Sequence, residues 1–460
     1  MGEEVVYRQD WLGIRPYFYN SKSGQHGCHL NDAFNLQNFE LCTAGVSDFL
    51  TFGYSVFGST PVQNVKFVPA NHTLRKKSDG SLYVSRDEFD PVNAYLEKTS
   101  DPADALELLL NWNHEEESNE EILPLSSGMD SRLLALNRVR HRKIPHCYTY
   151  GTSRRQWDSD EVHGAREIAR SLNLPWQRVE LTGFHQEISP WRELFGSSVH
   201  LHGMYQLRFY REISKQHKSG TVISGIIGDL WARSHSLSPP RRALDLRQYS
   251  YNHGLGLPDA AINRRLDTSN LESEFEQLGD SLDTELGRTA YLVRTKMMLL
   301  SYLKTVPESF GFSFASPFLD SEIALTIASI DRKQRHDRLW LKKFFDTTEV
   351  PVPEHPVGTR SPFLDLGELQ RNPLPPLSPS LLSRYVDPAY IEKVNSYVRK
   401  ISVRGQASLR LLEMRRIGPS VGRRLWEPEL QSSYNSYMCL RPIQDLIEVA
   451  SGDQKFGRNP

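Results

Sequence analysis

The residues best suited to chemistry form a short loop of small and hydroxylated side chains, Leu125-Ser126-Ser127-Gly128-Met129-Asp130-Ser131. The apolar run Ile122–Leu125 predicts a strand before this loop, and Ser131–Val139 predicts a helix after it. Unpaired N–H groups at a helix N-terminus attract phosphate, and Gly128 lets the backbone approach it closely. Because Asp130 would repel a bare phosphate, it indicates a bridging Mg²⁺. The loop predicts a phosphate site, with an ordinary strand-to-helix turn as the alternative.

The segments after this loop alternate between two periodicities. His146–Tyr150, Gln177–Leu181 and Thr221–Ser224 are apolar runs typical of strands, whereas Asp158–Leu172 has its apolar residues at helical spacing. Alternation of this kind predicts a parallel sheet covered by helices on both faces. The phosphate loop would then lie at the carboxyl end of a strand, which is where ligands bind in such sheets.

The flanking parts of the chain have a different character. Short apolar runs separated by turn-forming residues over the first hundred residues predict an antiparallel β domain. Residues from Glu272 to Phe345, and those near the C-terminus, have the pattern of helices. The proline-rich segment Asn372–Pro379 breaks that pattern and predicts a linker or a surface excursion.

Composition narrows the classes of protein to consider. A chain of 460 residues with 38% hydrophobic and 24% charged residues is typical of a soluble globular protein of about two or three domains. The net charge of -1 argues against a dedicated nucleic-acid binder. The 4 cysteines are far apart in sequence, which argues against zinc and disulfide frameworks. There is neither a signal-peptide pattern nor an apolar run of about 20 residues, so we expect a cytoplasmic protein without a membrane partner.

The loop resembles the PP-loop of the N-type ATP pyrophosphatases, S-G-G-x-D-S. In that family the loop holds the pyrophosphate released when ATP is cleaved between its α- and β-phosphates. Ser127 stands where the motif has its first glycine, and a serine fits there if its φ is negative.

Other segments extend the resemblance in the same order as in the asparagine synthetase superfamily. Asp10–Tyr19 is similar to that family's strand pair D-x-L-G-x-R-P-L-Y-Y, and Tyr148–Gly151 with Ser159–Glu161 resembles its second strand and helix. Ser224–Asp229 occupies the place of S-G-E-G-x-D, and Pro317–Asp320 matches P-F-L-D. The family joins an N-terminal glutaminase domain to a C-terminal PP-loop synthetase domain.

This resemblance implies an α/β protein with three parts. Residues 1–100 would be a degenerate glutaminase-like β domain, a remnant of an Ntn-hydrolase-like fold. Residues 101–370 would be the PP-loop synthetase domain, with the parallel sheet of the adenine nucleotide α-hydrolase-like folds. Residues 371–460 would be a helical C-terminal extension.

The resemblance also implies a role for each matched residue of an ATP site. The adenine pocket would be lined by Leu125, Tyr150 and the adjoining Gly151. The pyrophosphate would be held by Ser126, Ser127, Gly128 and Ser131, and other parts of the nucleotide by Ser224 and Gly225. Mg²⁺ would be shared by Asp130 and Asp229, because carboxylates on separate loops can hold a phosphate-bound metal. A loop-capping role is the alternative for Asp229.

The N-terminal part departs from the family at its nucleophile. The family's glutaminase uses a cysteine at the mature N-terminus, but here Met1 is followed by Gly2. Cys28 and Cys42 lie downstream of the matching segment and do not substitute for it. We therefore expect ammonia or an amine to come from elsewhere, with a separate protein as one source.

The synthetase part departs mainly on its substrate side. Ile226 replaces the acidic residue of S-G-E-G, Leu230 replaces the one after the metal aspartate, and Ser313-Phe-Ala315 stands where the family has E-x-R. A late lysine of the family, which neutralises phosphate, has no clear counterpart. Arg360 is the best stand-in, although an ordinary surface position is the alternative. Arg338 occupies the place of another lysine, and Lys342 lies nearby as a second candidate catalytic cation.

These observations predict an ATP-dependent, AMP-forming amide ligase without its own glutaminase activity. It would adenylate a small-molecule or peptide carboxylate and transfer the acyl group to ammonia or an amine. One alternative is a catalytically degenerate nucleotide-binding partner in a biosynthetic complex. Another, an RNA-modifying PP-loop enzyme, is disfavoured by the near-zero net charge.

Overall fold

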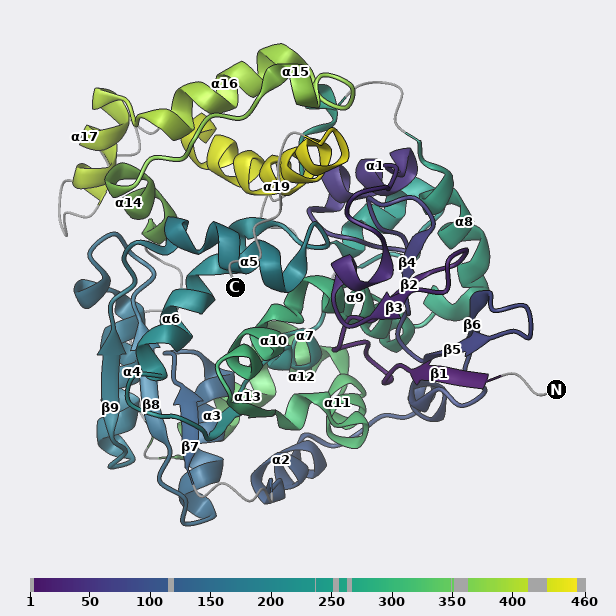
Figure 1. Cartoon of the computed structure of the whole chain (residues 1–460). Helices are drawn as coiled ribbons and strands as arrows, with labels where there is room; N and C mark the ends of the chain where they lie inside the picture. Colours follow the sequence, from purple (N-terminus) through teal and green to yellow (C-terminus); the bar gives the residue numbers. More distant parts are fainter. Residues whose placement is uncertain are drawn as a thin grey trace.

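One parallel sheet and two antiparallel sheets form the framework of this computed structural model (Figure 1). The structure describes residues 4–114, 120–235, 237–250, 256–262, 267–348, 350, 363–412 and 428–452. The fold is mixed α/β, as expected from the alternating pattern of the sequence.

The N-terminal strands form two antiparallel three-stranded sheets, as predicted for this region. One sheet has the order β1-β5-β6, from β1 (Glu4–Arg8), β5 (His72–Lys76) and β6 (Leu82–Arg86). The other has the order β3-β2-β4, from β2 (Phe18–Asn20), β3 (His26–Gly27) and β4 (Val65–Phe67). The segment Asp10–Tyr19, compared above with a strand pair, forms a turn that leads into β2. Backbone N–H groups of Leu12 and Gly13 donate to Asp10 Oδ1 at 2.9 and 2.8 Å, which makes a turn between β1 and β2.

The parallel sheet has five strands in the order β11-β10-β7-β8-β9. Its strands are β7 (Glu121–Pro124), β8 (His146–Tyr150), β9 (Trp176–Val179), β10 (Thr221–Ile223) and β11 (Ser313–Ala315). All neighbouring strands pair in parallel. The predicted strands are confirmed, but the expectation of continuous helix from Glu272 to Phe345 is wrong, because β11 lies inside that range. β11 contains Phe314 between two small residues, whereas the equally short β10 is a run of β-branched residues, which is a stronger strand signal.

Helices cover both faces of this sheet, as neighbouring strand residues show. Leu123, Cys147 and Ile223 belong to a core cluster with residues of α3 and α4. The residues beside them in sequence, including Ile122 and Tyr148, face the larger core cluster, which contains residues of α6 and α10. Because side chains alternate across a strand, these two clusters lie on opposite faces.

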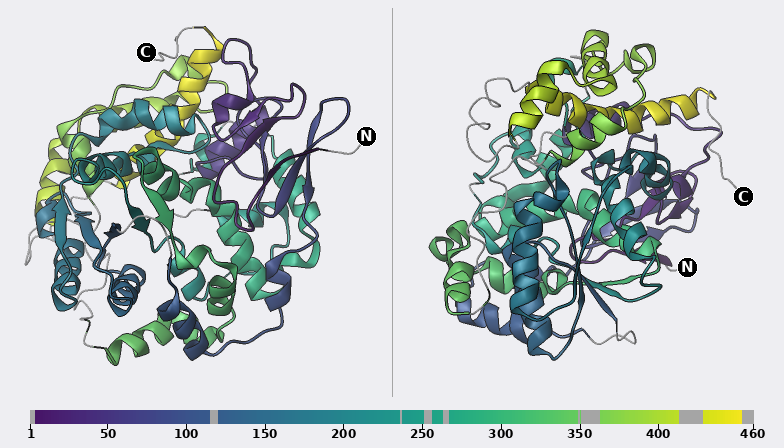
Figure 2. Two further views of the ribbon diagram at one scale, coloured as in Figure 1. Left: turned by 60° about the horizontal axis from the view of Figure 1, so that its bottom comes forward. Right: turned by 90° about the vertical axis from the view of Figure 1, so that its left-hand side faces the viewer.

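The helices connect and surround the three sheets, and the C-terminal ones gather at one end of the molecule (Figure 2). Those up to β10 are α1 (Thr43–Phe52), α2 (Pro102–Asn111), α3 (Met129–Arg140), α4 (Asp160–Ser171), α5 (Ile188–Phe195) and α6 (Tyr205–Ile213). Those from β10 to residue 348 are α7 (Gly228–Ala232), α8 (Ser269–Leu278), α9 (Glu285–Leu300), α10 (Tyr302–Ser309), α11 (Ser321–Ala328), α12 (Arg332–Arg335) and α13 (Leu339–Asp346). The C-terminal ones are α14 (Leu364–Arg371), α15 (Pro379–Leu382), α16 (Pro388–Arg399), α17 (Val403–Leu412) and α19 (Pro428–Ala450).

The proline-rich segment is extended, as its composition predicted, but it is not a surface excursion. Leu374 and Leu377 are only 3% and 2% exposed. The Leu377 N–H donates to Asn395 Oδ1 at 2.7 Å, and Asn395 Nδ2 donates back to the Leu377 carbonyl at 2.9 Å. Proline prevented helix here, while the leucines between the prolines were still drawn into the core.

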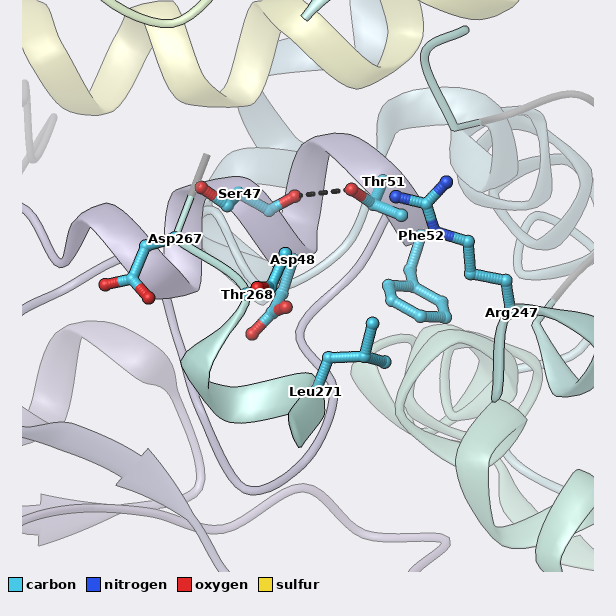
Figure 3. A pocket seen from close by; sticks show the side chains of 8 residues that line it. All are labelled: Ser47, Asp48, Thr51, Phe52, Arg247, Asp267, Thr268 and Leu271. Atoms are coloured by element: carbon cyan, nitrogen blue, oxygen red, sulfur yellow. Dashed lines mark hydrogen bonds between the residues drawn. The ribbon is translucent and has the colours of Figure 1, made fainter. Parts of the chain in front are cut away.

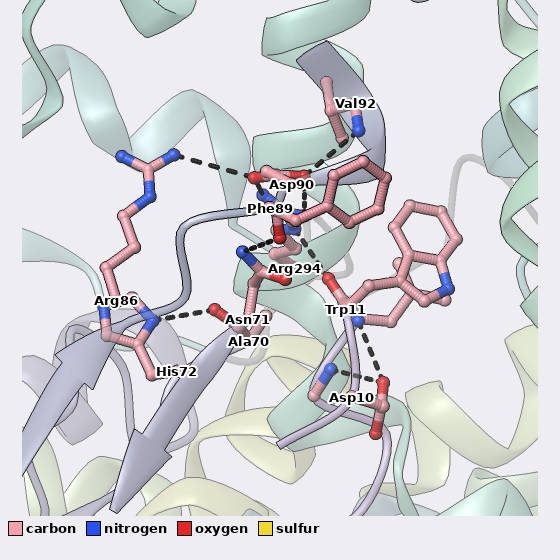
Figure 4. Close-up of polar contacts among 12 residues, drawn as sticks. Asp10, Trp11, Ala70, Asn71, His72, Arg86, Phe89, Asp90, Val92 and Arg294 are labelled. Atoms are coloured by element: carbon pink, nitrogen blue, oxygen red, sulfur yellow. Dashed lines mark hydrogen bonds and ion pairs between the residues drawn. The ribbon is translucent and has the colours of Figure 1, made fainter. Parts of the chain in front are cut away.

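A buried ion pair joins the N-terminal strands to helix α9 (Figure 4). Arg294 donates to both carboxylate oxygens of Asp90 at 2.8 Å, and its Nε donates to the Trp11 carbonyl at 2.9 Å. Burial by itself would raise the pKa of Asp90, but the hydrogen bonds and charge of Arg294 outweigh it, and the pKa is lowered. The antiparallel region is therefore held to the rest of the chain by a specific polar contact.

The larger core cluster runs across the expected domain boundaries, with members from Leu12 to Leu446. The boundaries at residues 100 and 370 stay predictions. Within the described ranges, no helix combines the length and apolar character needed to cross a membrane.

Candidate functional site

The order of the parallel strands identifies one edge of the sheet as a ligand-binding position. From β7 the chain moves outward to β8 and β9, then returns to the other side of β7 to add β10 and β11. The direction of winding therefore reverses between β7 and β10, and open α/β sheets bind ligands at such a switch point, beyond the carboxyl ends of the strands. The loops after β7 and β10 are Leu125–Gly128 and Ser224–Ile227. The topology thus brings the two loops predicted from the sequence together.

The loop after β7 is a compact turn held by its own serines. The Ser126 N–H donates to Ser131 Oγ at 3.0 Å, the two hydroxyl oxygens lie 2.8 Å apart, and the Gly128 N–H donates to Ser126 Oγ at 3.1 Å. Helix α3 follows directly, with Gly128 as its N-cap and no capping by any described side chain. Its unpaired N–H groups stay directed out of the helix, which suits an anion.

Ser127 fits the place of the family's glycine, but a buried carboxylate already occupies its donors. It is not among the described residues with positive φ, so the condition for a serine there is met. Its N–H donates to Glu161 Oε1 at 3.1 Å and its hydroxyl to Glu161 Oε2 at 2.9 Å. Burial raises the pKa of Glu161, and these hydrogen bonds oppose that shift. Sequence reasoning missed this role; the available signal is an acidic residue in the first turn of the helix that follows β8.

Asp130 lies beneath the second loop, where two glycines make room for it. A Cβ on Gly228 would come within 2.9 Å of Asp130 Cγ, and one on Gly225 within 3.1 Å of Asp130 Cβ. Burial raises the pKa of Asp130 to about 7, and the nearby negative charge of Asp229 adds to this rise. The predicted pair of carboxylates is therefore brought together, from the first turn of α3 and the first turn of α7.

The residues present fit a divalent metal. Asp130 Oδ1 is buried and has no hydrogen-bond partner among the described residues. A hard cation such as Mg²⁺ takes carboxylate oxygens of this kind and completes its shell with phosphate and water. Within the described part of the chain, no group of three or more His, Cys, Asp or Glu side chains forms a self-sufficient metal site. The phosphates would therefore have to supply the remaining ligands.

The cation paired with Asp130 is Arg338. Its Nη1 lies 3.5 Å from Asp130 Oδ2, and it lowers the pKa of Asp130 against the effect of burial. The ammonium group of Lys342 is instead paired with Asp337, so it does not approach Asp130. Arg360 lies outside the described residues. Asp337 and Arg338 have φ values of 51° and 56°, and such strained backbone often marks functional positions.

The predicted adenine-pocket residues lie at the ends of β7 and β8. Leu125 is 1% exposed, and its side chain packs in the smaller core cluster. The Tyr150 ring packs against Tyr205 and Phe209, with centroids 5.5 and 5.2 Å away. A Cβ on Gly151 would come within 2.0 Å of the Gln156 carbonyl oxygen, so only glycine fits there. These side chains are engaged by the protein, which leaves backbone atoms for contacts with a base.

The loop after β10 starts with a serine turn. Ser224 N–H donates to the Ala315 carbonyl at 2.9 Å, and Ser224 Oγ accepts from the Ile226 N–H at 3.2 Å. Ile226 is 4% exposed, so the position that is acidic in the family is filled by a core side chain here. Ile227 has φ of 55°, a conformation that costs a β-branched residue energy. The loop therefore keeps a fixed shape beside Asp130.

The pocket shown in Figure 3 is separate from this site. It lies between α1 and α8 and is lined by Ser47, Asp48, Thr51, Phe52, Arg247, Asp267, Thr268 and Leu271. Asp48 accepts a hydrogen bond from Asn270 at 2.8 Å, and burial raises its pKa to about 7. None of the sequence-predicted residues lines this pocket. The cysteines of the N-terminal region are also elsewhere: Cys28 is exposed, and Cys42 caps α1.

Neither a protein-family model nor a curated protein matches the sequence.

Proposed function

We propose that the chain is an ATP-dependent, AMP-forming amide ligase of the asparagine synthase type, without glutaminase activity of its own. It would adenylate a carboxylate and transfer the acyl group to ammonia or an amine supplied from elsewhere. The observation that carries the proposal is the meeting of the loops after β7 and β10 at the switch point of the sheet, where Gly225 and Gly228 pack against Asp130 and the charge of Asp229 acts on it.

In this proposal the chain's residues bind and orient the triphosphate. The N–H groups at the start of α3 and the hydroxyls of Ser126, Ser127 and Ser131 would donate to the β- and γ-phosphates. Asp130 and Asp229 would hold Mg²⁺, which neutralises phosphate charge when bound. Arg338 lies beside Asp130 and would add a permanent positive charge.

The reaction needs no covalent intermediate with the protein. A carboxylate oxygen of the substrate attacks the α-phosphorus, the bond to the bridging oxygen of the β-phosphate breaks, and pyrophosphate leaves. An amine nitrogen then attacks the acyl carbon of the adenylate, AMP leaves, and the amine loses one proton. The site contributes chiefly by positioning the reactants and stabilising charge.

The residues that would face the carboxylate substrate support a substrate other than aspartate. Ile226 is buried where the family has an acidic residue, and Ser313 and Ala315 replace a charged pair on β11. The Ser313 hydroxyl lies 2.9 Å from Thr221 Oγ1 within the sheet. These changes remove charge that would recognise a polar amino acid, so we expect a less polar carboxylate.

The direct test is release of AMP and pyrophosphate from ATP in the presence of candidate carboxylates and an amine. Asp130→Asn keeps the shape of the side chain and removes its charge, so turnover should fall at least a hundredfold, on the order of one lost metal contact. Asp104→Asn, at an exposed position of α2, is the matched control and should leave turnover unchanged. Full activity of Asp130→Asn would contradict the proposal.

A degenerate nucleotide-binding partner is the second candidate. Two contacts favour it, because Asp337 holds the Lys342 ammonium and Glu161 occupies the Ser127 donors. It predicts ATP binding by calorimetry without exchange of labelled pyrophosphate into ATP for any carboxylate. Detectable exchange would exclude this candidate.

A further inference from the structure

Arg132 is a buried arginine directly behind the phosphate loop. It lies in the first turn of α3 and is only 2% exposed. Its Nη2 donates to the Ser127 carbonyl at 3.0 Å, and its guanidinium lies 4.8 Å from the centroid of the Phe345 ring. The side chain therefore joins the loop to α13.

Most of the hydrogen-bonding capacity of this guanidinium is unused. Its Nε and Nη1 are buried and have no partner anywhere in the described ranges. Arg138, on the same helix and 0% exposed, is fully paired by comparison: its Nε, Nη1 and Nη2 donate to Asn137, Glu121 and the Trp112 carbonyl. Since buried polar groups are nearly always paired, the free nitrogens of Arg132 point to a partner that binds from outside the chain.

The charges around Arg132 indicate that this partner is an anion. An arginine guanidinium is positively charged at neutral pH, and the positive charge of Arg338 lies near enough to interact with that of Arg132. Arg338 itself is paired only loosely with Asp130, at 3.5 Å. A bound polyanion would offset the electrostatic repulsion between these two guanidinium groups.

We propose that Arg132 binds the pyrophosphate portion of ATP, together with Arg338, and supplies the cation that the sequence lacks at the family's late lysine. This proposal rests on the proposed function and assigns a residue that sequence reasoning did not single out. The free Nε–H and Nη1–H groups lie on different sides of the planar guanidinium, so each would donate to a different phosphate oxygen of the pyrophosphate.

The anion reaches these nitrogens by displacing part of the cover formed by α13. Phe345 covers one face of the guanidinium, and α13 begins directly after the left-handed residues Asp337 and Arg338. Their strained conformations, with φ of 51° and 56°, favour a shift of the helix that relaxes them. Phosphate binding and movement of α13 are therefore linked in this proposal.

Calorimetric titration with inorganic pyrophosphate and Mg²⁺ separates this role from a structural one. In Arg132→Met the affinity for pyrophosphate should fall at least tenfold. In Arg132→Lys, which keeps the charge but not the planar set of N–H donors, it should fall at least threefold. Arg140→Met changes the same charge at an exposed position of the same helix and should bind like wild type. AMP, which lacks the pyrophosphate, should bind all of these proteins equally.

Thermal unfolding without ligand gives the second measurement. Arg132→Met should melt at or above the wild-type temperature, because it removes an unpaired buried charge and keeps the side-chain volume. If Arg132 only supports the loop, the variant melts lower while the folded protein binds pyrophosphate as before, and the proposal is overturned. If Arg132→Met does not fold, unchanged pyrophosphate binding by Arg132→Lys overturns it.

The proposed function and this inference fail in distinguishable ways. Wild-type protein that binds ATP and pyrophosphate, with both Arg132 variants binding equally well, removes the role of Arg132 and leaves the proposed function standing. Wild-type protein that binds neither ATP nor pyrophosphate removes both.

Discussion

Replacing Glu161 with glutamine should strengthen the binding of ATP. In the structure the Glu161 carboxylate accepts from the Ser127 N–H at 3.1 Å and from the Ser127 hydroxyl at 2.9 Å. These are donors that the proposed function assigns to a phosphate. A nucleotide phosphate therefore has to displace the Glu161 carboxylate from Ser127. The free energy of binding is reduced by the free energy of the hydrogen bonds that are broken.

The size of the effect follows from the two hydrogen bonds. A hydrogen bond to a charged group contributes about 1.5–3 kcal/mol, and glutamine, which has one acceptor oxygen and no charge, can keep only one of the two in neutral form. Losing one charge-assisted bond weakens the internal competitor by that amount, which corresponds to about ten- to hundredfold in ATP affinity. Burial raises the pKa of Glu161, which means that its charged form is disfavoured in the protein. We therefore expect an increase in ATP affinity in the lower half of the ten- to hundredfold range.

The assay is calorimetric titration with ATP and Mg²⁺ at pH 8. Glu167→Gln, at an exposed position of the same helix, removes the same charge and should bind ATP like wild type. If Glu161→Gln binds ATP more weakly than wild type, Glu161 orients Ser127 for phosphate instead of competing with it, and the reasoning is refuted.

Three further outcomes follow from contacts described above. Arg294→Met leaves the buried Asp90 carboxylate with Arg86, 3.6 Å away, and the Val92 N–H, so it should cost about 3 kcal/mol in urea unfolding at pH 7, the lower end for a broken buried pair. Burial without Arg294 would raise the pKa of Asp90, so the wild-type advantage should start to shrink as pH falls through the variant's raised pKa and should be smallest below the lowered wild-type pKa; an equal loss at all pH values would contradict this. For Asp48, whose folded pKa is raised to about 7, the wild type should lose stability as pH rises from about 4 to 7, and Asp48→Asn should be about 1–3 kcal/mol more stable at pH 8. Gly228→Ala should abolish ATP binding, because its Cβ would meet Asp130 Cγ at 2.9 Å; calorimetry showing wild-type affinity would exclude that packing.

The framework of the parallel sheet was predictable because its first strands carry their own signals. His146–Tyr150 is an apolar run of strand length, and the helix found from Asp160 to Ser171 has apolar residues at helical spacing. β11 was not predictable, because its three residues gain their strand conformation from pairing with β10. The prediction of a surface excursion at Asn372–Pro379 failed because the proline content indicated the absence of helix but carried no information on burial.

The candidate site divides in the same way. Ser126 to Ser131 and Ser224 to Asp229 were found from local sequence, since a loop between a strand and a helix is a local feature. Glu161 was not found, because its contact with Ser127 from another helix is set by tertiary packing. Arg132 contacts Ser127 locally, but its burial against Phe345 is a tertiary feature that the sequence did not indicate. The choice between Lys342 and Arg338 also depended on backbone conformation, because the left-handed turn at residues 337 and 338 directs one cation to Asp337 and the other to Asp130.

A crystal structure with Mg²⁺ and an ATP analogue that has a methylene group between its α- and β-phosphorus atoms tests the central claim most directly. The account predicts the β- and γ-phosphates on the N–H groups of the Ser126–Ser131 loop, the metal between Asp130 and Asp229, and Glu161 displaced from Ser127. A nucleotide bound away from the carboxyl ends of β7 and β10, or a triphosphate with no contact to this loop, would contradict it.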